Sequence, residues 1–131
     1  MPEFPTITHV ALTVRDLTTS VPWYRRLFDA APVLDEDTGA FHHVVWLVGG
    51  TTLVGLHEFP DLDDASAFNE RRLGLDHLAF QCSNRAELES WATRLDELGI
   101  AHGPIVDARY GSGLSFRDPD NIALEFFAPP S

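Results

Sequence analysis

The sequence ITHVALTVRDL at positions 7–17 is repeated in outline by LDHLAFQCSNR at positions 75–85. His9 falls on His77 at this offset of 68 residues. The same offset, with no gap, produces further identities: Ala11 with Ala79, Trp23 with Trp91, Arg26 with Arg94, Leu27 with Leu95, Ala40 with Ala108, Leu56 with Leu124 and Phe59 with Phe127. Because these identities also keep the phase of strands and helices, they indicate an internal duplication.

Each half predicts one βαβββ unit. In the first half, hydrophobic patterning predicts a helix and four strands, at 17–28 and at 7–14, 32–35, 42–48 and 52–59. The second half predicts the same order, with a helix at 85–98 and strands at 75–82, 101–106, 114–117 and 122–127. We expect units at about residues 6–59 and 74–128, joined by an acidic connector at about 60–73, within a single domain of residues 1–131.

Local signals support these boundaries. Asp16 and Asn84 occupy matching positions and predict the N-caps of the two helices. Gly99 predicts the end of the second helix. The Gly pair at 49–50 and the segment DPDN at 118–121 predict the turns of two hairpins.

Charge and composition limit the partners. The chain has 20 acidic and 9 basic residues, for a formal net charge of −11, so we expect it to bind neither nucleic acid nor a membrane. No apolar run is long enough to span a bilayer, and the N-terminus does not resemble a signal peptide. The single cysteine, Cys82, precludes an intrachain disulfide and predicts a cytoplasmic protein.

Four polar side chains fall on strand faces that the core does not need: His9, His57, His77 and Glu125. The offset that relates His9 to His77 also relates His57 to Glu125. Two-fold packing of the units would bring all four together. A single inward-facing histidine is commonly an ordinary core residue, so the prediction depends on the joint pattern.

Three imidazoles and one carboxylate suit Zn, Ni, Co, Mn or Fe(II). The absence of sulfur from this set disfavours Cu(I) and iron–sulfur clusters. We therefore predict that His9, His57, His77 and Glu125 bind a divalent metal ion. Ligation by His57 is the least determined of the four.

The chain resembles the vicinal oxygen chelate superfamily, which includes glyoxalase I, extradiol dioxygenases, fosfomycin and bleomycin resistance proteins and methylmalonyl-CoA epimerase. The resemblance is carried by ITHVALTVRDL, WYRRLF, LDHLAF and FRDPDNIALEFF. Together with the duplication it implies an α+β fold, in which two tandem βαβββ units form a cup-shaped mixed β-sheet with the helices outside. It also implies a homodimer and a small-molecule ligand.

The resemblance assigns metal binding to His9, His77 and Glu125, and makes His57 a variable fourth ligand. The metal of such enzymes chelates two neighbouring substrate oxygens as a Lewis acid. Glyoxalase I has glutamate at the position of His57, and the epimerase usually has glutamine. Extradiol dioxygenases share the two histidines and the glutamate but commonly have four units. Fosfomycin-modifying enzymes match in length and in the three core ligands, but their basic, potassium-binding loop is not evident here.

We therefore expect a metal-dependent enzyme, either a lyase or isomerase or a ring-cleaving dioxygenase. Glu125 would move a proton, and Tyr110 in the stretch ARYGSGLSF would donate a proton or hydrogen bond, although a surface tyrosine would also fit. One alternative is a protein of the bleomycin-resistance kind that sequesters a drug or metabolite without chemistry. Another is a regulatory or partner protein that keeps only the fold.

Four further features have ordinary interpretations. His42 and His43 are adjacent, so one of them faces the candidate site, and either could be plain sheet surface. Glu58 is expected in solvent, because it faces away from His57. Arg117 begins a hairpin turn, and the acidic connector is expected to be a solvated loop.

Overall fold

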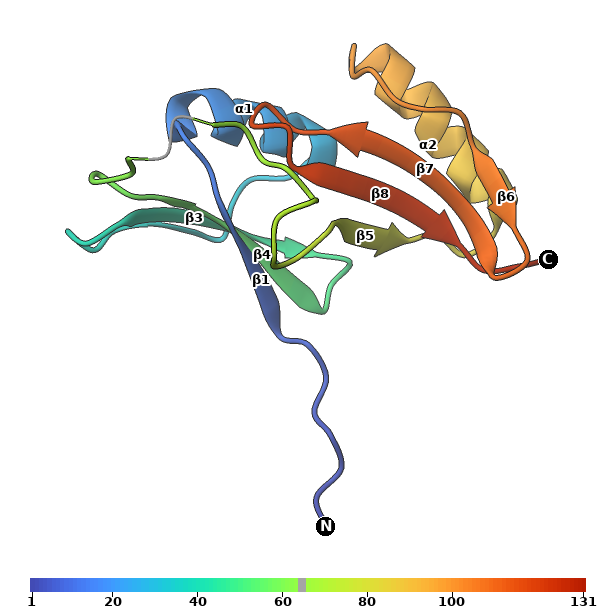
Figure 1. The fold of residues 1–131 in the computed structure, drawn as a ribbon, viewed down its shortest axis with the longest axis horizontal. Coiled ribbons are helices and arrows are strands. Elements are labelled where there is room, and N and C mark those ends of the chain that lie inside the picture. The colour runs from blue at the N-terminus through green and yellow to red at the C-terminus, as the bar shows by residue number, and fades with distance from the viewer. Residues whose placement is uncertain (64–65) are drawn as a thin grey trace. The chain divides into compact units, whose positions relative to one another are not determined.

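The computed structural model describes residues 1–63 and 66–131, and the chain divides into two compact units, Met1–Ala65 and Ser66–Ser131. Each unit is a βαβββ motif with one helix and one four-stranded mixed sheet (Figure 1). The predicted α+β class with two tandem units is therefore confirmed. The grouping of both units into a single domain stays a prediction.

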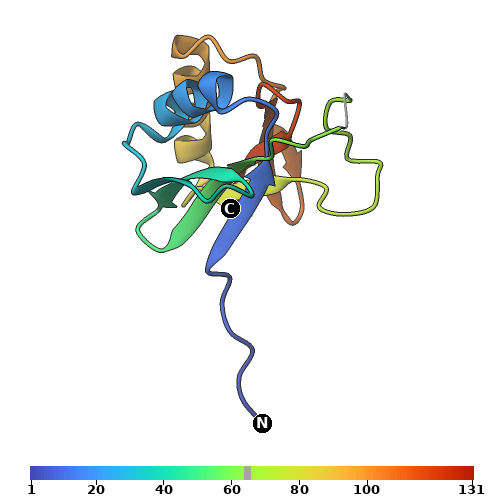
Figure 2. The ribbon, with the colours of Figure 1, turned by 90° about the vertical axis from the view of Figure 1, so that its left-hand side faces the viewer.

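Unit 1 contains the first five elements of the chain. They are β1 (His9–Thr13), α1 (Leu17–Phe28), β2 (Leu34–Asp37), β3 (His42–Val48) and β4 (Thr52–Glu58). The sheet order is β1-β4-β3-β2, and the β1–β4 pairing is parallel while the others are antiparallel. Residues before β1 extend away from this sheet (Figure 2). The predicted strand at 32–35 lies two residues later, as β2.

Unit 2 repeats this plan. Its elements are β5 (Leu78–Gln81), α2 (Arg85–Glu97), β6 (Val106–Ala108), β7 (Gly111–Arg117) and β8 (Ala123–Ala128), in the sheet order β5-β8-β7-β6. The strand predicted at 101–106 is wrong over most of its length, since β6 begins only at Val106. Pro104 lacks the N–H that a ladder needs, so this segment forms only an isolated bridge, from His102 to Phe116.

The helix starts are capped as predicted, with one addition. The Asp16 carboxylate accepts a hydrogen bond from the Thr18 N–H at 2.9 Å, and Asn84 caps α2 in the same way. The Glu58 carboxylate accepts the Leu17 N–H at 2.7 Å. The expectation that Glu58 only faces solvent is therefore wrong: it is half-buried and binds a free N–H of the first turn of α1.

The core of each unit lies between its helix and the sheet face that carries no predicted ligand. In unit 1, Tyr24 of α1 and Trp46 of β3 are fully buried, and the indole N–H donates to the Ala30 carbonyl at 3.0 Å. In unit 2, Trp91 of α2 stacks on Phe126 of β8 with ring centroids 4.2 Å apart. Burial of each such large side chain contributes about 2–3 kcal/mol. The opposite face of each sheet therefore has no structural need for its polar residues.

The single thiol is a core group. Cys82 is free, and burial raises its pKa to about 11, so it is unreactive at neutral pH. Within the described residues, neither α1 nor α2 is long and apolar enough to cross a membrane.

Candidate metal and substrate site

The structure divides the four predicted metal ligands equally between the units. His9 and His57 belong to unit 1, and His77 and Glu125 belong to unit 2. Within residues 1–63 and 66–131, no three His, Cys, Asp or Glu side chains lie close enough together to hold a metal ion. We call the pair His9 and His57, and the pair His77 and Glu125, the two half-sites. Their convergence on one metal ion stays a prediction.

In unit 1, sheet register places both predicted ligands on one face. Thr13 of β1 pairs with His57 of β4, and strand alternation puts His9 on the same face as Thr13. Gly55 lies between these positions, and a Cβ added there would make ordinary contact with the His57 ring at 3.9 Å. His9 is exposed and His57 is half-buried.

A third imidazole belongs to this face. His43 of β3 lies directly opposite His57 of β4, and their ring centroids are 5.3 Å apart. The buried Nε2 atom of His43 has no hydrogen-bond partner and lies 3.5 Å from a carboxylate oxygen of Glu36. Phe41 stacks on His57 at 4.6 Å. Unit 1 therefore presents imidazoles packed among aromatic rings.

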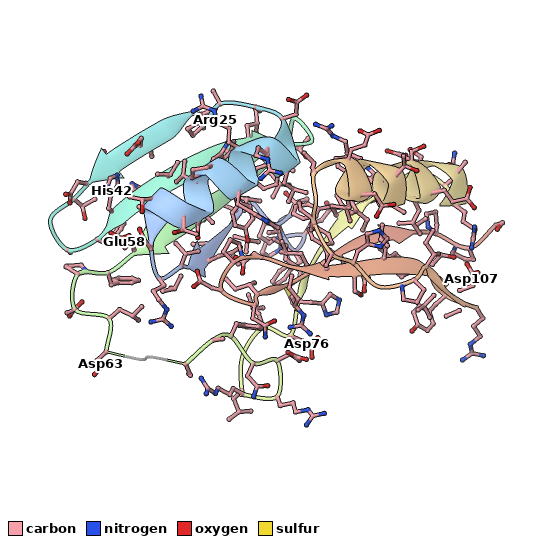
Figure 3. All side chains as sticks on the ribbon, turned by 90° about the horizontal axis from the view of Figure 1, so that it is seen from above. Arg25, His42, Glu58, Asp63, Asp76 and Asp107 are labelled. Atoms are coloured by element: carbon pink, nitrogen blue, oxygen red, sulfur yellow. The ribbon has the colours of Figure 1, made fainter. Side chains whose placement is uncertain are left out.

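The register also decides between the two adjacent histidines. His42 pairs with Glu58, whose carboxylate reaches the start of α1, so His42 faces away from the half-site (Figure 3). Its Nε2 atom lies 2.5 Å from the Asp35 carboxylate, which raises the pKa of His42. His43 is the member of the pair that faces His57.

Burial lowers the pKa of His57, and the neighbouring imidazoles of His43 and His9 lower it further. A lowered pKa keeps the imidazole neutral near pH 7. Because a metal ion needs the unprotonated ring, this environment suits a ligand.

Unit 2 contains a pocket of about 350 Å³ around Glu125. Its polar side chains are those of His77, Tyr110, Ser115 and Glu125. Its apolar side chains, which form more of the pocket surface, are those of Ala79, Val106, Ala108 and Phe127. None of the described arginines lines it, and the chain has no lysine. The pocket combines an apolar wall with a few polar groups, as small-molecule sites do.

Ser115 and Gly113 of β7 lie beside the Glu125 carboxylate. Glu125 on β8 lies opposite Ser115 on β7, whose hydroxyl donates to the carboxylate at 3.5 Å. A Cβ added at Gly113 would lie 3.2 Å from the Glu125 carboxyl carbon. A larger residue at this position would displace the carboxylate. The small residues of GSGLS, at positions 111–115, are visible in the sequence. Only the pairing of β7 with β8 shows that Gly113 and Ser115 lie beside Glu125.

His77 has a carboxylate that orients its ring. The Nδ1 atom of His77 lies 2.8 Å from the Asp76 carboxylate. This contact favours the tautomer with the proton on Nδ1, so Nε2 carries the lone pair. Carboxylate–histidine pairs of this kind orient metal ligands in many proteins. Asp76 was not among the residues predicted from the sequence, although a carboxylate directly before a predicted ligand is visible there.

Tyr110 belongs to the lining of the Glu125 pocket. Its ring is parallel to that of Phe127, with centroids 6.3 Å apart. Tyr110 is 73% exposed, so its hydroxyl is accessible. Gly111, with φ +143°, lets the Phe127 ring approach, because an added Cβ would lie 2.3 Å from its Cζ. Proton donation by Tyr110 stays a prediction.

The donor sets fit a divalent metal ion. His57 is held neutral, and the buried Nε2 of His43 beside it has no hydrogen bond. His77 is oriented by its carboxylate partner, and Gly113 leaves space around Glu125. These are nitrogen and oxygen ligands with supporting contacts, as Zn, Mn or Fe(II) sites require.

The chain matches known proteins over most of its length. The sequence model of the Glyoxalase/Bleomycin resistance protein/Dioxygenase superfamily matches residues 6–126. The metallothiol transferase FosB of Shouchella clausii is 33% identical over 123 residues, which cover 91% of this chain and 77% of that protein. A crystal structure of a glyoxylase/bleomycin resistance protein/dioxygenase domain from Frankia sp. EAN1pec superposes with a TM-score of 0.86 at 32% identity, covering 97% of this chain and 99% of that one.

A more distant structure shows the fold alone. A variant of the fosfomycin resistance protein FosX from Listeria monocytogenes, complexed with Mn(II) and dihydroxypropylphosphonic acid, superposes with a TM-score of 0.69 at 22% identity. The match covers 95% of this chain and 90% of that one.

Proposed function

The chain belongs to the Glyoxalase/Bleomycin resistance protein/Dioxygenase superfamily, and we propose that it is a metal-dependent enzyme that binds its substrate through two neighbouring oxygens. One observation carries this proposal. His77, oriented through Nδ1 by Asp76, and the Glu125 carboxylate line the same small-molecule pocket. A pocket that served only packing would need neither the oriented imidazole nor the open carboxylate.

Four residues would hold the ion: His9 and His57 from unit 1, and His77 and Glu125 from unit 2. When bound, the ion supplies a Lewis acid for two substrate oxygens. His57 would bind the ion through an imidazole that burial keeps neutral. Glu125 has two carboxylate oxygens, so one can bind the ion while the other accepts a proton.

The remaining pocket residues bind and orient the substrate. Val106 and Phe127 form an apolar wall against which an apolar part of the substrate can pack. The Tyr110 hydroxyl donates a hydrogen bond, or a proton, to substrate at the pocket mouth. Ser115 supports the Glu125 carboxylate.

The substrate we propose differs from the one that the relatives' names suggest. FosB is named as a metallothiol transferase, and FosX as a fosfomycin resistance protein that binds Mn(II) and a phosphonate. Mn(II) is therefore among the candidate metals. However, none of the described arginines lines the Glu125 pocket, whereas arginines commonly bind phosphate-type groups through paired hydrogen bonds. A chelating molecule with an apolar flank fits this lining better.

Metal analysis tests the proposal. Protein purified without chelator should contain about one divalent ion per chain, and His77→Ala should lose it. A metal-free protein whose thermal stability does not respond to Zn, Ni, Mn or Fe(II) would overturn the proposal.

A substrate panel then identifies the chemistry. Catechols, hemithioacetals, 2-oxo thioesters and fosfomycin should be assayed with the metal-loaded protein and with Tyr110→Phe. Turnover that falls in Tyr110→Phe with metal content unchanged assigns Tyr110 to the reaction. Tight binding without turnover of any member would favour a sequestering protein of the bleomycin-resistance kind. Light scattering tests the expected homodimer.

A further inference from the structure

A second, polar pocket in unit 2 lies between residues 66–73 and the turn at 118–121. Its volume is about 500 Å³. The side chains that carry the argument are Arg71, Arg72, Arg117, Glu70, Asn69 and Asn121. It shares no lining residue with the Glu125 pocket. We call it the arginine pocket.

The charge of the arginine pocket is opposite to that of the chain. The chain has a net charge of −11, and its nine basic residues are all arginines. Three of these nine line this one pocket, against the single carboxylate of Glu70. The formal charge of the lining residues is therefore +2, with Asp76 and the Asp118 and Asp120 carboxylates of the adjoining turn outside the lining, and the lining charge favours an anion.

One arginine of the pocket already binds an oxyanion of the chain itself. The two terminal nitrogens of Arg117 each lie 3.0 Å from a different carboxylate oxygen of Glu70. Arg117 holds the pKa of Glu70 down at about 2, and the more distant Asp76 adds to the field at Arg117. This two-pronged geometry is the one in which guanidinium groups bind carboxylate and phosphate. The expectation of a plain solvated connector is wrong at Glu70.

Backbone contacts hold the other two arginines in place. The Phe68 N–H donates to the Asp120 carbonyl at 2.9 Å, and the Asn121 amide donates to the Phe68 carbonyl at 3.0 Å. Asn69 accepts the Arg71 N–H at 3.0 Å. The loop is thus fixed against the turn before any ligand arrives, which lowers the entropic cost of binding.

The two arginines differ in their own contacts. Arg72 donates from its guanidinium to the Ser66 hydroxyl at 2.9 Å. The Arg71 guanidinium makes no hydrogen bond to any residue that the structure describes, and its charge acts on Glu70. Arg71 therefore has donors available for a ligand.

We propose that the arginine pocket binds a tetrahedral oxyanion of the phosphate class through Arg71 and Arg72. Planar guanidinium forks match tetrahedral oxyanions, and the fixed loop presents two of them beside a third. Two charge-assisted contacts at an exposed site predict a dissociation constant of about 1 mM or tighter at low salt. This site is independent of the proposed metal chemistry.

The test uses inorganic phosphate and metal-free protein in chelator, so that phosphate cannot bind a metal ion. Saturable binding, followed by calorimetry or phosphorus NMR line broadening, is expected at about 1 mM and should weaken as salt rises. Sulfate should compete, and acetate should compete less. In the double variant R71A/R72A, phosphate binding should weaken at least about tenfold.

The matched control is R25A/R109A, which removes two exposed arginines outside the pocket. It therefore has the same net charge as R71A/R72A. Its phosphate affinity should change less than about threefold. Absence of saturable binding to the wild-type protein up to 10-fold above the expected constant would overturn the proposal. Equal weakening in the two double variants would also overturn it, because net charge alone would then explain the binding.

Discussion

The β3–β4 hairpin of unit 1 and the β7–β8 hairpin of unit 2 carry the two half-sites in different surroundings. His57 lies opposite His43 in the first hairpin, whereas Glu125 lies opposite Ser115 in the second. Two residues before His43 stands Phe41, which stacks on His57; two residues before Ser115 stands Gly113, which makes room for Glu125. Rings fill the space beside His57, and small residues open a pocket beside Glu125.

The difference arises from where the two hairpin turns lie. The turn between β3 and β4 is centred on residue 50 and the turn between β7 and β8 on residue 120, which is 70 positions later instead of 68. The offset of 68 residues relates His57 to Glu125, but the partner strand in unit 2 is shifted further, so Ser115 rather than Gly111 takes the place of His43. Duplication preserved the ligand positions, and the shifted turn changed what faces them.

Gly39, in the turn between β2 and β3 of unit 1, and Gly111, the first residue of β7 in unit 2, provide the largest expected contrast. Gly111→Ala should lower the free energy of unfolding by about 3 kcal/mol, because a Cβ at φ +143° would meet the Phe127 ring and the Ala128 carbonyl. Gly39→Ala should lower the free energy of unfolding by about 1 kcal/mol. The positive φ is strained for alanine, but the added Cβ would meet no neighbour within 4 Å. Urea unfolding measures both. Equal losses would contradict the close packing assigned to unit 2.

Asp76 and Thr8 precede the repeated histidines and give the second contrast. Asp76→Thr gives His77 the neighbour that His9 has, and should weaken metal binding about tenfold by releasing the Nδ1 contact. Competition with a chromophoric chelator measures the affinity. The control Asp63→Thr removes an exposed carboxylate from the connector and should leave the affinity unchanged (Figure 3). If both variants bind metal like the wild type, Asp76 does not orient a ligand.

Acid titration of Glu70, in the polar pocket of unit 2, gives the smallest expected effect on stability. The pKa of Glu70 is about 2 in the folded chain against an ordinary value of 4.5, chiefly because Arg117 donates to it. Its contribution to stability is therefore full above pH 4.5 and is lost as pH falls toward 2. Glu70→Gln should flatten the fall in stability over this window, measured by thermal unfolding at a series of pH values.

The control for the acid titration is Glu97→Gln, which removes an exposed carboxylate from a helical ion pair with Arg94. Such exposed pairs contribute little, so its profile should follow that of the wild type. If Glu70→Gln also follows the wild type, the Glu70–Arg117 contact does not persist in solution.

Much of the architecture could be predicted from local patterns. Strand alternation placed His9 and His57 each on the side of its strand opposite the core residues, because side chains along a strand point to opposite sides in turn. Asp16 and Asn84 were identified as caps, since a helix start needs side-chain acceptors within three residues. These features depend on neighbours in sequence, which are visible without a fold.

Other features depended on pairing between distant strands. Alternation requires His42 and His43 to face opposite sides, but only the register with β4 shows that His43 faces His57. Glu58 reaches the start of α1 across 41 positions of sequence, and Glu70 reaches Arg117 across 47. No local pattern encodes such contacts.

The sequence by itself determined the duplication, the two βαβββ units, the family and the strand faces that carry His9, His57, His77 and Glu125. Periodicity and an internal offset suffice for these, because they repeat along the chain. Only the tertiary structure decided that one half-site is packed with rings and the other opens into a pocket. That outcome depends on which residue of one strand lies opposite which residue of the next, and the position of the intervening turn sets this register.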